Sequence, residues 1–115
     1  MTDLPAAAAD APLLAIRGLE VRFRTETGDV TPVRGVDLDV FAGRVSALVG
    51  ESGSGKSVTS LATMGLLPRP SGGVSAGSIR YTARDGATAD LAALPSGAMR
   101  ALRGREIAMI FQEPM

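Results

Sequence analysis

The stretch GESGSGKS, residues 50–57, fits the pattern G-x-x-x-x-G-K-[ST] and contains Lys56, the only lysine of the chain. Every other basic residue is an arginine. The stretch follows a short apolar run and precedes residues with helical spacing, which is the usual context of a loop that binds phosphate. A Gly/Ser linker that happens to contain a lysine is the alternative, and this context favours phosphate binding over it.

Each residue type in this loop has a physical task. Glycines let the backbone wrap closely around a phosphate, so that successive N–H groups point inward, and the helix that follows adds the positive end of its dipole. The compact ammonium of Lys56 reaches between the β- and γ-phosphates, where the planar guanidinium of an arginine is bulkier. Ser57 offers a small hydroxyl to Mg²⁺. The loop therefore predicts a nucleotide site with Mg²⁺.

Composition narrows the chemistry further. The 115 residues are enough for at most one small domain, and twelve basic and twelve acidic residues leave no bulk charge that would attract nucleic acid. Without cysteine or histidine there are no disulfides, no thiolate metal sites and no histidine base. Nowhere do about 18 consecutive apolar residues predict a membrane span. Residues 1–12 are expected to form a flexible tail rather than a signal peptide.

The N-terminal part of the chain has the alternation of β-structure. Residues 13–24 end with apolar and charged residues in strict alternation, which predicts a half-buried strand. Residues 26–29, ETGD, are typical of a turn, and residues 33–40 alternate again. Together they predict an antiparallel pair with one solvated face.

The pattern then changes. Residues 45–49 and 106–111 are apolar on both faces, as in buried strands of a parallel sheet. Residues 57–67 have helical spacing. A short helix is expected over 96–104. A further strand is expected over 77–83, with a surface loop over 84–97. Three arginines are expected on a solvated helix face rather than in a phosphate patch: Arg100, Arg103 and Arg105.

Three stretches resemble the ATP-binding subunits of ABC transporters, and more narrowly the oligopeptide/dipeptide permease branch. They are VGESGSGKSVT at 49–59, MGLL at 64–67 and MIFQEPM at 109–115. The loop alone indicates only a P-loop NTPase, and FQEPM makes the narrower assignment. The resemblance implies an α/β fold, in which an incomplete P-loop NTPase core lies beside an antiparallel β-subdomain. It also implies an ATPase that uses ATP and Mg²⁺ to drive uptake of peptides or similar solutes.

The resemblance also implies roles for single residues. Lys56 and Gln112 take the catalytic positions, and Ser57 and Gln112 ligate Mg²⁺. Phe23 falls where the family stacks an aromatic ring on adenine, although a core Phe at the end of a strand is the alternative. Gln112 would also meet the membrane subunit together with Glu113 and Pro114, and an ordinary polar residue is its alternative. The nucleotide-binding loop comprises Gly50, Glu51, Ser52, Gly53, Ser54, Gly55, Lys56, Ser57 and Val58.

The family needs parts that this sequence lacks: an LSGGQ-like signature, an apolar strand ending in Asp-Glu, and a switch histidine. Residues 13–115 are therefore expected to be the N-terminal half of an ABC ATPase domain, which alone does not hydrolyse ATP. Its expected partners are a second ATPase domain, permease subunits through the Gln112 loop and, indirectly, an extracytoplasmic solute-binding protein. No nucleic acid is expected. The expected location is the cytoplasmic face of the cell membrane, as a peripheral subunit.

Two other interpretations stay open at this point. The first is an ABC ATPase of another class, such as an exporter, or the first half of a tandem two-domain ATPase. The second is an unrelated P-loop kinase or GTPase, or a nucleotide-binding module without catalysis. The identity of a transported solute is not encoded in this part of the sequence.

Overall fold

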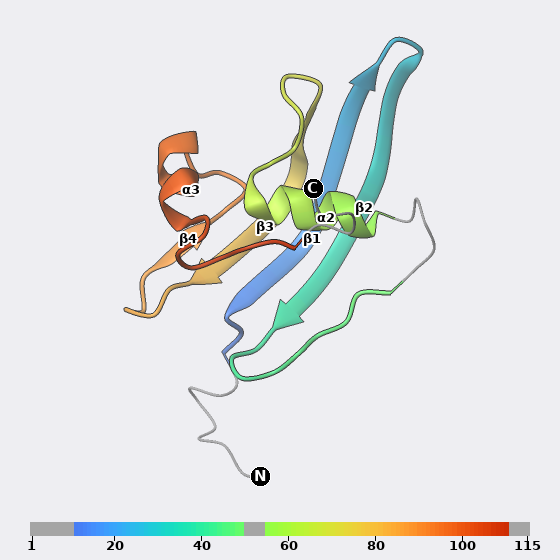
Figure 1. Cartoon of the computed structure of the whole chain (residues 1–115). Helices are drawn as coiled ribbons and strands as arrows, with labels where there is room; N and C mark the ends of the chain where they lie inside the picture. The colour runs from blue at the N-terminus through green and yellow to red at the C-terminus, as the bar shows by residue number, and fades with distance from the viewer. Residues whose placement is uncertain (1–10, 50–54, 111–115) are drawn as a thin grey trace.

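The computed structural model describes residues 11–49 and 55–110, and its centre is a four-stranded antiparallel sheet (Figure 1). The strand order is β2-β1-β3-β4. The strands are β1 (Leu14–Thr25), β2 (Gly28–Val40), β3 (Gly72–Thr82) and β4 (Thr88–Asp90). The predicted hairpin is confirmed, because β1 and β2 pair antiparallel around a turn that begins after Thr25.

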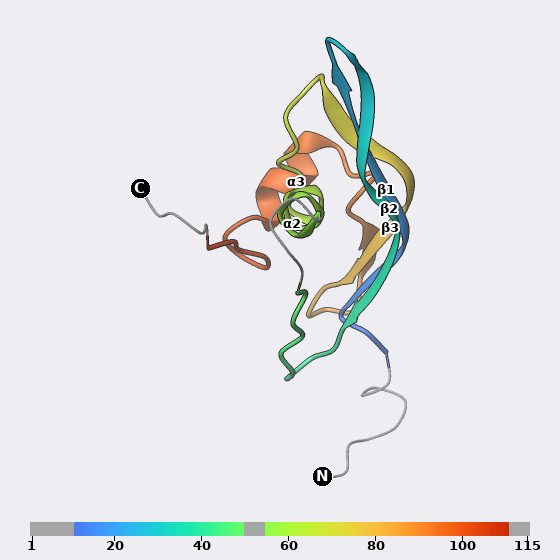
Figure 2. The same ribbon diagram turned by 90° about the vertical axis from the view of Figure 1, so that its right-hand side faces the viewer.

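Within the described residues, two short helices cover the sheet, and Figure 2 shows both on the same face of it. The helices are α2 (Lys56–Met64) and α3 (Ser96–Leu102). The first ends earlier than the predicted residue 67, because Gly65 adopts the left-handed conformation and its N–H caps the carbonyl of Ala62. No helix in the described ranges has the length and apolar character needed to cross a membrane.

The core lies between this face of the sheet and the helices. Leu19 and Val21 are fully buried, as the alternation predicted for β1. Ile16 is buried as well, although it lies three residues before Leu19, because a register shift between them reverses the phase of the strand. The other buried apolar residues of the cluster are Val33, Ala62, Ile79, Tyr81, Leu91 and Met99.

The structure corrects the predicted parallel strands. Residues 45–49 and the described part of 106–111 form no strand, and Val45, Val49 and Ile110 are 98%, 84% and 94% exposed. The sheet of the described residues is wholly antiparallel. A strand needs at least one hydrogen-bonded neighbour along its length, and within the described residues these two segments have only a single isolated parallel bridge, between Ile107 and Arg103. The α/β core is therefore only partly formed.

The region after β3 is more ordered than predicted. The expected surface loop over 84–97 contains β4, and Leu91 directly after it is buried. The strand predicted over 77–83 begins five residues earlier, at Gly72, because its first half pairs with β1. The predicted helix over 96–104 is confirmed but ends at Leu102.

Tyr81 on β3 links the sheet to the turn that follows α3. Its hydroxyl donates a hydrogen bond of 2.6 Å to Oε1 of Glu106, and its side chain is only 8% exposed. This hydrogen bond, with burial second, raises the pKa of Tyr81 from 10.0 to about 12.

We expect this raised pKa to be visible in a titration of the folded chain. Tyr81 is the only tyrosine and there is no tryptophan, so tyrosinate absorbance reports this group alone. The midpoint should lie near pH 12 in native buffer and near 10 in concentrated urea. The hydroxyl proton of Tyr81 therefore contributes to the free energy of unfolding. This contribution is complete below pH 10 and is lost as the pH rises to about 12. A native midpoint near 10 would contradict the hydrogen bond.

Candidate functional site

The described end of the glycine-rich loop forms the start of α2. Residues 50–54 lie outside the described residues, and Gly55 is the N-cap, with φ 96° and ψ 2°. A Cβ added at Gly55 would lie 2.9 Å from the carbonyl oxygen of Pro32 and 3.2 Å from Cγ2 of Val33. A side chain is therefore disfavoured at this position for two reasons: the backbone is left-handed, and a Cβ would collide with β2.

The first turn of α2 favours an anion at its N-terminal end. Both the backbone N–H and the hydroxyl of Thr59 donate to the carbonyl of Gly55, at 2.9 and 2.8 Å, which fixes the turn. The first N–H groups of a helix have no acceptor within the helix, and the N-cap residue Gly55 has no side chain to cap them. No acidic residue occurs in the first turn. Negative charge on a ligand would therefore meet N–H groups and the positive end of the dipole.

The structure places four predicted site residues side by side at this end: Gly55, Lys56, Ser57 and Val58. The side chain of Ser57 is exposed, whereas Lys56 and Val58 are half-buried. Gly55 and Lys56 line a cavity of about 390 Å³, with walls that include Pro32 and Val33 from β2 and Leu48 from the preceding segment. Its volume is within the range of small-molecule sites.

Phe23 lies elsewhere on the sheet, near the hairpin end of β1. It pairs with Val30 on one side and Gly72 on the other. Its half-buried ring covers Gly72 so closely that a Cβ there would lie 2.7 Å from Cδ1 of the ring and closer still to Cε1. Phe23 therefore packs against the core, and its ring retains some exposed surface.

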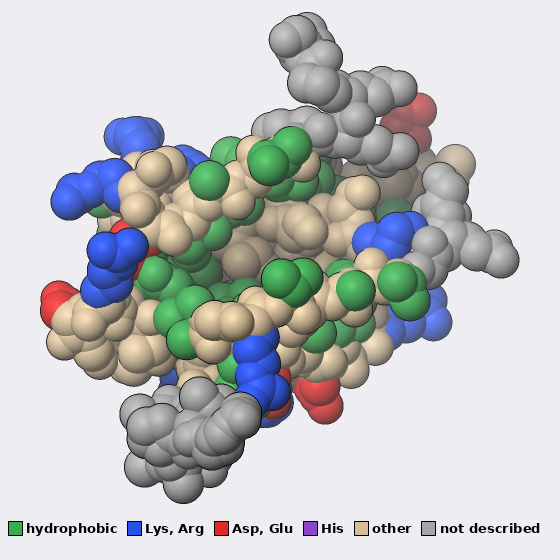
Figure 3. Space-filling model, turned by 60° about the horizontal axis from the view of Figure 1, so that its bottom comes forward, with side chains coloured by type: hydrophobic (Ala, Val, Ile, Leu, Met, Phe, Trp, Pro, Cys, Tyr) green, Lys and Arg blue, Asp and Glu red, His purple; other side chains and the backbone are tan. Residues whose placement is uncertain are grey.

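The predicted residues Gln112, Glu113 and Pro114 lie outside the described residues. The segment that leads to them is described as far as Ile110. Residues 107–110 line a groove of about 350 Å³, and its other lining residues include Ser60 and Thr63 of α2. Figure 3 shows hydrophobic side chains on both rims of a hollow on this face. Residues 107–110 and α2 therefore line the same groove.

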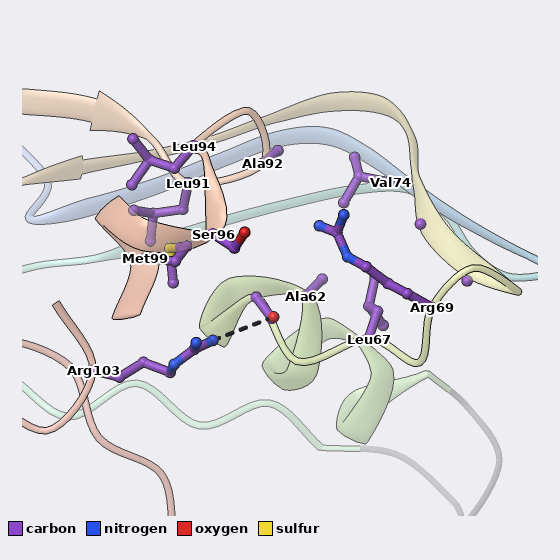
Figure 4. Close-up of a pocket in the computed structure, with 13 residues that line it drawn as sticks. Ala62, Leu67, Arg69, Val74, Leu91, Ala92, Leu94, Ser96, Met99 and Arg103 are labelled. Atoms are coloured by element: carbon purple, nitrogen blue, oxygen red, sulfur yellow. Dashed lines mark hydrogen bonds between the residues drawn. The ribbon is translucent and has the colours of Figure 1, made fainter. Parts of the chain in front are cut away.

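One residue predicted to be solvated has a structural role instead. Nη1 of Arg103 donates to the carbonyl oxygens of Met64 and Gly65, at 2.8 and 3.3 Å, and Figure 4 shows the bond to Gly65. The prediction of a solvated face was wrong for this arginine. The partners lie 38 and 39 residues away in the chain, so no local pattern reveals them.

Comparison with known proteins decides the family. The sequence profile of the ABC transporter family matches residues 33–115. The chain belongs to the ABC transporter family. The resemblance inferred from the loop and from FQEPM is thereby confirmed, and the family is one of P-loop NTPases.

Several relatives in this family have names that describe import. The chain is 53% identical over 104 residues to a protein of Brucella ovis that is provisionally named a peptide import ATP-binding protein. It is 47% identical over 103 residues to the dipeptide transport ATP-binding protein of Bacillus subtilis, and 44% identical over 103 residues to the glutathione import ATP-binding protein of Pectobacterium atrosepticum. Each match covers 90% of this chain but only 31%, 29% and 16% of the relative. The chain therefore spans less than a third of the length of these relatives.

Proposed function

We propose that this chain provides the phosphate-binding half of an ATP site in an ABC subunit that drives the import of peptides or similar solutes. The observation that carries the proposal is the start of α2. There Gly55 is seated against β2, and Lys56 and Ser57 follow in the first turn, at the end of a GESGSGKS loop. The names of the relatives supply the class of solute.

In this proposal, different residues bind the phosphates of the nucleotide and the cation. The backbone N–H groups of the loop and of the first turn of α2 hold the phosphates, and Lys56 balances the charge between the β- and γ-phosphates. Ser57 is an exposed residue in the first turn of α2, where a hard cation bound to phosphates can use its hydroxyl as a ligand. Gln112 is proposed as a second ligand. The described residues contain no cluster of three or more carboxylates, which fits a cation held mainly by phosphate and hydroxyl oxygens.

The names of the relatives also support a proposal about partners. The subunit would bind peripherally to permease subunits at the cytoplasmic face of the membrane, through the loop around Gln112, and would pair with a second ATPase domain. Both a single-domain and a tandem subunit fit the proposal. Matches of 103 residues cover 29% of the dipeptide protein but only 16% of the glutathione protein, so the glutathione protein is nearly twice as long. Import of solute would follow from closure of the two ATPase domains on ATP.

The direct test substitutes Lys56 in the subunit that contains this chain. Lys56→Ala should lower ATP turnover about 100-fold or more, because one fixed positive charge on the phosphates is lost. Lys56→Arg should also impair turnover, since the guanidinium does not fit the compact position. Arg105→Ala, which removes an exposed cation outside the loop, serves as the control. Phosphate release near the wild-type rate in Lys56→Ala would refute the proposal.

We further propose that the exposed part of the Phe23 ring stacks on adenine. Phe23→Leu keeps apolar packing on Gly72 but removes the aromatic face, so ATP affinity should fall by roughly 1–2 kcal/mol. The free energy of unfolding should change by less than about 1.5 kcal/mol. Phe23→Tyr keeps the face and should bind ATP as the wild type does. If a fluorescent ATP analogue binds Phe23→Leu with wild-type affinity, the ring has only a core role.

A further inference from the structure

A second cavity lies between the C-terminal end of α2, the start of β3 and α3, and it contains no residue of the nucleotide loop. Its volume is about 130 Å³, and Arg69 and Arg103 are the only charged residues among the described residues that line it. The rest of the lining is mainly apolar and includes Ala62, Leu67, Val74, Leu91, Leu94 and Met99. Three of these residues, Ala62, Leu91 and Met99, belong to the buried core, so the cavity adjoins the core directly.

The two arginines of this cavity differ in their partners. Nη1 of Arg103 donates to the carbonyl oxygens of Met64 and Gly65, at 2.8 and 3.3 Å, at the end of α2 where the helix dipole favours a cation. The side chain of Arg69 has no hydrogen bond or ion pair with any residue in the described ranges. Figure 4 shows its guanidinium and the hydroxyl of Ser96 pointing into the cavity from different elements. The donors of Arg69 are therefore available to a ligand.

The charge of the cavity favours an anion. Two positive charges, with no carboxylate among the described lining residues, attract a negative group and repel a cation. The planar guanidinium of Arg69 can donate two parallel hydrogen bonds to a carboxylate, and the hydroxyl of Ser96 can donate another. A free amino acid is disfavoured, because its ammonium group would enter the cavity without a carboxylate to balance its charge. The polar groups therefore fit a carboxylate that carries no amine.

The volume and the apolar walls define the rest of the ligand. A cavity of about 150 Å³ can hold a benzene molecule, so a volume of about 130 Å³ suits a ligand of about six or seven non-hydrogen atoms. A carboxylate of this size has a short aliphatic tail, which would contact the apolar walls while the charged end meets Arg69. Inorganic phosphate has no apolar part and would gain nothing from these walls.

We propose that this cavity is a binding site for a small organic carboxylate with a short aliphatic tail, held by Arg69 and Ser96 against the wall that contains Met99. The site lies at the C-terminal end of α2, whereas Lys56 and Ser57 lie at the N-terminal end. It is therefore distinct from the proposed nucleotide site, and neither site depends on the other.

The test uses isovalerate as the probe and valine, which adds an amine to the same carbon skeleton, as its matched comparison. The 115-residue chain is labelled at its five methionine methyl groups, and the NMR signal of Met99 is assigned with Met99→Leu. Isovalerate should shift the Met99 signal in a saturable way and leave the signal of Met109, which lines a different groove, unchanged. Valine should bind at least about 10-fold more weakly, because its ammonium group is desolvated without a counter-charge.

Two substitutions test the polar groups separately. Arg69→Ala should weaken isovalerate binding roughly 10-fold, because charged hydrogen bonds are lost, and Ser96→Ala should weaken it about threefold, because a neutral hydroxyl is lost. Arg100→Ala is the matched control, since Arg100 is an exposed arginine of α3 that does not line the cavity. The affinity of Arg100→Ala for isovalerate should equal that of the wild type.

Several results would overturn the proposal. An unchanged Met99 signal would do so, as would shifts of Met64 and Met109 in its place, because these two residues line the apolar groove beside α2. Equal affinity for valine, inorganic phosphate and isovalerate would show that the arginines attract anions without a shaped site. Wild-type affinity in Arg69→Ala would exclude the proposed ion pair. None of these results affects the proposed function, which the turnover of Lys56→Ala tests independently.

Discussion

The approach of Gly55 to the backbone of β2 is the constraint on which the arrangement depends. The carbonyl of Pro32 lies where a Cβ of residue 55 would be, so the chain can turn into α2 at this point only without a side chain. The same glycine accepts both bonds from Thr59 that fix the first helical turn. Because the helix begins against the sheet, its buried residues Ala62 and Met64 reach the core, and its N–H groups face the end where the loop arrives.

The two ends of α2 then have different tasks. The N-terminal end carries Lys56 and Ser57, and the C-terminal end is held by Arg103. The family assignment indicates which ligand to expect at this helix start, since a loop of this type in an ABC protein is expected to bind the phosphates of ATP.

Local signals allowed much of the fold to be predicted. The hairpin of β1 and β2 and the start of α2 each depend on neighbouring residues, so alternation, turn chemistry and helical spacing reveal them. The segments 45–49 and 106–110 have the composition of buried strands, yet among the described residues their only pairing is an isolated bridge between Ile107 and Arg103. The bridge from Arg103 to Met64 escaped prediction because it joins residues 39 positions apart.

The most direct test of the account compares two alanine substitutions in urea unfolding of the 115-residue chain. Gly43 and Gly55 both have positive φ, at 74° and 96°, but a Cβ at Gly43 meets no atom within 4 Å. Gly43→Ala should therefore cost only the left-handed backbone strain, about 1–2 kcal/mol. Gly55→Ala should cost about 1–3 kcal/mol more, because its Cβ meets the Pro32 carbonyl. Equal losses for the two variants would contradict the claim that this contact seats α2.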